Sequence, residues 1–75
     1  MCLNELKLGE NAIVLEIKKE APLKQRFLDL GIISGMKIMC VLESPFKNPK
    51  AYEIRGTTIA IRDEDAKFIK VERMD

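Results

Sequence analysis

Hydrophobic and polar residues alternate along five short segments of the chain, a period of two that is typical of β-strands. The segments are residues 11–20, 36–44, 51–55, 57–62 and 67–72. In the first segment the alternation groups Ile13, Leu15 and Ile17 on one face, and in the second it groups Ile38, Cys40 and Leu42. The pattern therefore predicts a mainly β protein of about five strands.

One segment, "APLKQRFLDLG", has helical periodicity instead. Leu23, Phe27 and Leu30 stand at i, i+4 and i+7, the spacing of a buried helix face, and Pro22 precedes them where a first helical turn tolerates proline. Gly31 follows as the left-handed residue after the helix. We expect one short α-helix between strands one and two, with these three apolar side chains in the core.

Turn signals separate the remaining segments. Ser34-Gly35 predicts a turn into the second strand, and Gly56 predicts a tight hairpin between strands three and four. The stretch "SPFKNPK" contains two prolines and predicts a loop, and Asp63 is expected to cap a single helical turn over "DEDA". Without linker or repeat, residues 1–75 are expected to form one domain, a small β-barrel.

Composition and charge narrow the function. The 13 basic and 12 acidic residues are interspersed, which predicts a soluble surface without strong steering toward nucleic acid. The start of the chain lacks signal-peptide features, and no apolar run approaches a membrane span, so we expect a cytoplasmic monomer without membrane insertion. In that compartment Cys2 and Cys40 are expected to be reduced.

Candidate chemistry is sparse. The chain contains no histidine that could act as a base for either cysteine, and no phosphate-binding loop, so we expect no catalysis. Asp63, Glu64 and Asp65 are adjacent carboxylates that cannot converge on one ion within a single turn, so helix capping and solvation are favoured over a metal site. No cofactor is expected.

Three ordered groups of residues resemble the FeoA family of small bacterial proteins of ferrous iron uptake. The matching positions are Leu3, Leu6, Gly9, Ala12, Val14 and Ile17, then Arg26, Leu30, Gly31, Ile32 and Gly35, and finally Glu53, Arg55, Gly56, Ala60, Arg62 and Ala66. The resemblance covers the whole chain and implies an SH3-like barrel. It also implies a non-catalytic accessory that docks on the cytoplasmic region of the membrane iron transporter FeoB, which includes a GTP-binding domain, and modulates it.

Five residues are candidates for contact with that partner: Arg26, Leu28, Phe46, Lys47 and Lys50. Leu28 lies about 140° around the helix from the start of the apolar stripe, so it either contacts a partner or packs under a loop. Phe46, with lysines alongside, either anchors a partner or folds back over an open barrel end. Arg26 has a local alternative in an ion pair with Asp29.

The glycines at 31, 35 and 56 are expected to shape turns rather than to bind. Two other functions stay open. Small barrels of this kind also bind single-stranded nucleic acid on stacked aromatic residues, although none is expected here because aromatic residues make up 5% of the chain and the charges balance. The resemblance extends to the barrel at the end of DtxR-type repressors, which leaves a metal-responsive regulatory domain as the second alternative.

Overall fold

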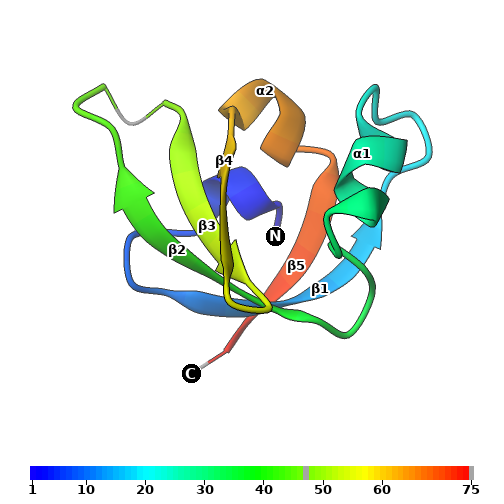
Figure 1. Cartoon of the computed structure of the whole chain (residues 1–75), viewed down its shortest axis with the longest axis horizontal. Coiled ribbons are helices and arrows are strands. Elements are labelled where there is room, and N and C mark those ends of the chain that lie inside the picture. The colour runs from blue at the N-terminus through cyan, green and yellow to red at the C-terminus, as the bar shows by residue number, and fades with distance from the viewer. Residues whose placement is uncertain (47, 75) are drawn as a thin grey trace.

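The computed structural model describes residues 1–46 and 48–74. Five antiparallel strands form one sheet in the order β4-β3-β2-β1-β5 (Figure 1). The strands are β1 (Asn11–Ile17), β2 (Lys37–Glu43), β3 (Lys50–Ile54), β4 (Thr57–Ile61) and β5 (Ile69–Met74), and the helices are η1 (Leu3–Glu5), α1 (Lys24–Asp29) and α2 (Asp63–Ala66). The predicted mainly β fold, with its short helix between strands one and two, is confirmed.

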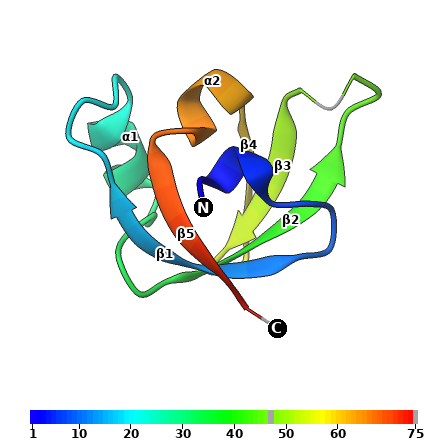
Figure 2. The ribbon, with the colours of Figure 1, turned by 180° about the vertical axis from the view of Figure 1, so that it is seen from behind.

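The sheet curls into a cup around the core (Figures 1 and 2). Helices η1 and α2 lie across the open end of the cup, α1 stands at one side, and the β2–β3 loop stands at the other. Among the described residues, seventeen hydrophobic residues are buried, including Leu3 and Leu6 from the N-terminal segment. None of the helices in the described part of the chain is long and apolar enough to cross a membrane.

A β-bulge in β1 changes which side chains face the core. The pairing of β1 with β5 shifts register between Val14 and Glu16, so Leu15 is the extra residue. Ala12, Val14 and Ile17 are buried, whereas Leu15 is 46% exposed. The expectation that Ile13, Leu15 and Ile17 share one face is therefore wrong, because the extra residue reverses the alternation within the strand.

A second bulge, in β2, also reverses which side chains face the core. The register with β3 shifts between Cys40 and Leu42. Ile38 and Cys40 are fully buried, but Leu42 is 62% exposed. The expectation that these three residues share one face is thus correct for the first two and wrong for Leu42.

Helix α1 is shorter than the pattern predicts, and it ends in a Schellman motif. Gly31, at φ +93°, donates its N–H to the Leu28 carbonyl, and Ile32 donates to the Phe27 carbonyl, both at 3.0 Å. Phe27 and Ile32 are both buried in the core. Leu23 precedes the helix and is 37% exposed, so the expectation that it is a core residue is wrong.

The β3–β4 hairpin turns through two left-handed residues, Arg55 at φ +54° and Gly56 at φ +80°. Ile54 and Thr57 pair on either side of this two-residue turn, and positive φ at both central positions is the type I′ geometry that matches strand twist. The turn fixes the register of β4 at the edge of the sheet.

The single helical turn over residues 63–66 forms as predicted, but its cap differs. Arg62 occupies the N-cap position, and Asp63 is the first helical residue. The Asp63 N–H instead donates to Asn48 Oδ1 of the β2–β3 loop at 3.1 Å. The Asn48 side chain, distant in sequence, thus caps this helical turn in place of Asp63, and its hydrogen bond joins the β2–β3 loop to α2.

Candidate docking site

A cleft of about 160 Å³ lies between α1, β4 and α2. Phe27 from α1 lines it together with the flanking Leu23 and Leu30, and β4 contributes residues 59–61. Phe27 is 3% exposed and Ile61 is also 3% exposed, so the base of the cleft belongs to the hydrophobic core. The cleft is therefore an apolar hollow, large enough to admit a side chain, rather than a polar catalytic pocket.

Two arginines and one aspartate also line this cleft. Arg26 belongs to α1, and Arg62 and Asp65 lie at α2. The local alternative for Arg26, an ion pair with Asp29, is not found among the described residues. Asp29 Oδ1 instead accepts a hydrogen bond from Gln25 Nε2 at 2.9 Å. The salt bridge found among the described residues joins Arg73 and Glu10 elsewhere on the surface. Both cleft guanidinium groups are thus available to an external carboxylate.

Leu28, the second candidate on α1, does not line the cleft. Successive helical residues are rotated by about 100°, so Leu28 and Arg26 project on opposite sides of Phe27. Leu28 is 38% exposed. One partner surface that includes both residues would have to pass over the outer side of α1.

The loop candidates lie far from α1. Phe46 is 91% exposed, so its side chain does not cover the barrel end. Lys47 lies outside the described residues. The β2–β3 loop, which carries Phe46, stands at the opposite side of the molecule from α1 in both views (Figures 1 and 2). Phe46 and the candidates on the helix therefore belong to separate surfaces.

Lys50 has an internal position that the sequence interpretation did not anticipate. Its side chain is 9% exposed, and Nζ donates to the carbonyls of Asn4 at 2.7 Å and Leu6 at 3.2 Å. These bonds anchor η1 across the open end of the barrel. With Nζ bonded to two carbonyls inside the protein, Lys50 is occupied as a structural residue and is not free to meet a partner.

The interior around Lys50 is polar but not reactive. The Tyr52 hydroxyl donates to the Leu3 carbonyl at 3.4 Å, and burial raises the pKa of this tyrosine well above its usual range. Burial also raises the pKa of the Cys40 thiol. Both effects keep these groups protonated and neutral at pH 7, which is opposite to what a nucleophile needs.

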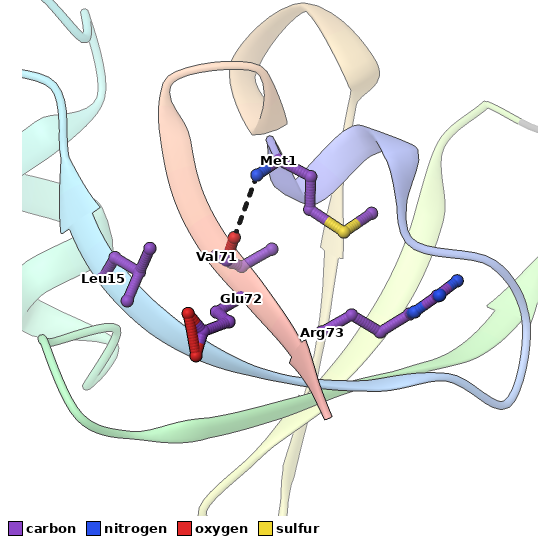
Figure 3. A pocket seen from close by; sticks show the side chains of 5 residues that line it. All are labelled: Met1, Leu15, Val71, Glu72 and Arg73. Atoms are coloured by element: carbon purple, nitrogen blue, oxygen red, sulfur yellow. Dashed lines mark hydrogen bonds between the residues drawn. The ribbon is translucent and has the colours of Figure 1, made fainter. Parts of the chain in front are cut away.

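A second depression, of about 580 Å³, lies on the β1–β5 side of the barrel (Figure 3). Met1 and Leu15 line it and are 45% and 46% exposed. Met1 and Val71 exchange two backbone hydrogen bonds, at 3.2 and 2.9 Å, so the first residue pairs with β5. Sequence reasoning missed this depression because Leu15 faces outward only through the bulge.

No group of three or more histidine, cysteine, aspartate or glutamate side chains in the described residues is arranged to hold a metal ion. The two cysteines are free, with Cys40 buried in the core. The cleft beside α1, with its unpaired arginines, is accordingly the site that the geometry best equips for binding a partner.

Comparison with known proteins identifies the family. The FeoA domain model matches residues 1–73. A Campylobacter jejuni protein bearing the name Fe(2+) transport protein A is 35% identical over 72 residues, 95% of this chain and 96% of that protein. A Porphyromonas gingivalis fusion of Fe(2+) transport protein A with the Fe(2+) transporter FeoB is 32% identical over 72 residues, 96% of this chain but 8% of the fusion.

A solved structure agrees with these relatives. The crystal structure of Stenotrophomonas maltophilia FeoA in complex with zinc, described as a procaryotic SH3 domain protein, superposes with a TM-score of 0.85. It is 26% identical and covers 96% of this chain and 89% of that one. The chain therefore belongs to the FeoA family, the SH3-like, non-catalytic accessory domains of ferrous iron transport.

Proposed function

We propose that this protein is a cytoplasmic accessory that docks on the cytoplasmic region of an FeoB-type iron transporter and shifts that transporter's conformational equilibrium. The observation that carries the proposal is the Porphyromonas gingivalis fusion, in which a region similar to this chain and FeoB form one polypeptide. In a fusion the two parts contact each other within one molecule, at a high effective concentration. A family member that is a separate chain lacks this advantage, so it must bind the transporter with sufficient affinity by itself.

The geometry supports a binding role over a chemical one. The cleft beside α1 combines an apolar base with two arginines that have no ion-pair partner among the described residues. An accessory that binds one transporter state more tightly than another shifts the population by its difference in affinity, and this requires no reaction. A docking surface and a stable scaffold are sufficient for that role.

The aromatic residues argue against the nucleic-acid alternative. The chain has three phenylalanines and one tyrosine. Phe27 and Tyr52 are buried, Phe68 packs partly against the core, and Phe46 is 91% exposed. A groove that binds single strands of any sequence stacks successive bases on several aromatic rings. Among the described residues, Phe46 is the one fully exposed aromatic ring.

Co-purification of this protein with an FeoB-type transporter tests the proposal. Membranes that contain the transporter are solubilised and passed over the immobilised protein, with and without a non-hydrolysable GTP analogue. We expect retention of the transporter and a difference between the two nucleotide conditions, because docking that biases a state must distinguish states. No retention in either condition would refute docking, and equal retention in both would refute the bias.

A further inference from the structure

We infer that the cleft beside α1 binds an extended segment of the transporter as an added β-strand along β4, with one aliphatic side chain in the cleft and a carboxylate between Arg26 and Arg62. This inference rests on the proposed function and specifies how the docking occurs. It follows from the hydrogen-bonding pattern of β4, from the cleft and from the charges around it.

Strand β4 forms one edge of the sheet. Because Ile54 and Thr57 close a two-residue hairpin, hydrogen-bonded pairs fall at Thr57, Ile59 and Ile61 of β4. The N–H and C=O groups of the intervening Thr58 and Ala60 therefore point away from β3. Neither residue takes part in a hydrogen bond to another loop or helix within the described residues.

This edge lacks the charges, prolines and bulges that often protect an exposed strand. The sequence of β4, "TTIAI", has no charged residue, no proline and no bulge, and it consists largely of residues that favour strands. The opposite edge differs, because Met1 and Cys2 pair with β5 there. An uncharged edge beside an apolar cleft is suited to strand addition, in which main-chain bonds give affinity and a side-chain pocket gives specificity.

The cleft sets the size of the side chain that enters. Its volume of about 160 Å³ equals roughly five water molecules at about 30 Å³ each. One branched aliphatic side chain fits within such a space. Ala60 lines both the cleft and the edge, so a strand bonded to Ala60 places its neighbouring side chain at the cleft entrance.

The charges around the cleft favour an acidic segment. Arg26 and Arg62 contribute two positive charges, and Asp65 contributes one negative charge. The cleft has an excess of one positive charge, and neither arginine forms an ion pair with another described residue. A carboxylate on the added strand therefore gains charge-assisted hydrogen bonds. The occupant is therefore an extended segment that carries an aliphatic residue close to an aspartate or glutamate.

Hydrogen exchange of the intact protein, measured alone and bound to the detergent-solubilised transporter, tests the inference directly. We expect the amide protons of Thr58 and Ala60 to exchange rapidly in the free protein and at least about tenfold more slowly in the complex. If both amides keep their free rates while the transporter is bound, strand addition is wrong but docking stands. If the transporter does not bind at all, the proposed function itself fails.

Substitutions provide an independent measurement. Ala60→Pro removes an outward N–H while leaving the bonds to β3 in place, and it should weaken transporter binding by about tenfold or more. Should this variant fail to fold, Arg26→Glu retains the edge and should weaken binding by a similar factor, whereas the matched control Lys70→Glu on β5 should not. Equal effects of Arg26→Glu and Lys70→Glu would overturn the assignment of the carboxylate position.

A second copy of this chain is the other possible occupant of the edge. Sedimentation of the protein alone, from micromolar to millimolar concentration, distinguishes the two. We expect a monomer throughout. A dimer that forms with rising concentration and disappears in Ala60→Pro would assign the edge to self-association and overturn the inference.

Discussion

Replacing Lys50 by methionine tests whether this lysine is a structural residue or part of a docking surface. Methionine retains much of the apolar stem but lacks the ammonium group. The bonds from Nζ to the carbonyls of Asn4 and Leu6, at 2.7 and 3.2 Å, are then lost. Hydrogen bonds from a charged group contribute about 1.5 to 3 kcal/mol each, and a buried acceptor left without a partner costs about 1 to 3 kcal/mol.

An opposing effect reduces this loss, because methionine does not have to be desolvated as an ammonium does. The loss should still prevail, since the bond to the Leu6 carbonyl is buried and no backbone N–H of the described residues donates to that carbonyl. We expect a net decrease of about 1 to 3 kcal/mol in the free energy of unfolding. For a domain of this size the melting temperature should fall by about 4 to 8 °C for each kcal/mol.

Urea and thermal unfolding, followed by circular dichroism, measure the effect, and Lys70→Met on β5 is the matched control. Lys70 is an exposed strand lysine, so its substitution should change stability by less than about 0.5 kcal/mol. If Lys50→Met is as stable as the wild type while binding to the transporter is lost, the structural assignment of Lys50 is wrong and the residue belongs to the interface.

Three further outcomes are expected. Phe27→Ala should lower stability by about 3 to 5 kcal/mol because Phe27 is 3% exposed, whereas Leu28→Ala, at 38% exposed, should cost under about 1 kcal/mol in the same urea titration. At pH 8 a thiol reagent should modify Cys2 and leave Cys40 unmodified until unfolding, since burial raises the pKa of the Cys40 thiol. Anaerobic calorimetry with iron(II) should detect no stoichiometric binding at micromolar concentration, and binding that Asp63→Asn with Asp65→Asn abolishes would contradict this.

The strand and helix order was predictable because it depends on local signals. Period-two alternation marks the strands. Gly31 marks the end of α1 and Gly56 marks the β3–β4 turn, two positions where the backbone has positive φ. The bulges were not predictable from the same alternation, because an extra residue leaves the pattern unchanged in sequence while reversing it in space. For this reason the pattern groups Leu15 with Ile17 and Leu42 with Cys40, whereas in the structure both leucines are exposed and Ile17 and Cys40 are buried.

The burial of Lys50 was indicated by its spacing in the sequence, but its charge favoured the opposite interpretation. Lys50, Tyr52 and Ile54 are spaced by two in β3, and all three are buried. Charge alone suggested a solvated position, whereas the period placed the side chain inside. The acceptors could not be inferred, since η1 has three residues and no periodicity. The cleft likewise depends on how α1 packs beside β4, which is a tertiary arrangement.

The separation of α1 from the β2–β3 loop determines how substitutions on the two surfaces should combine. The molecule measures 30 × 25 × 22 Å, and the two elements stand at opposite sides in both views (Figures 1 and 2). Effects of substitutions more than about 7 to 10 Å apart usually add within about 0.5 kcal/mol. Arg26→Ala and Phe46→Ala should therefore weaken transporter binding additively if both surfaces are used, as a double-mutant cycle by calorimetry would measure. A coupling energy above about 1 kcal/mol would mean that the loop reaches the cleft side in the complex, which the arrangement of the free protein does not allow without a rearrangement of the β2–β3 loop.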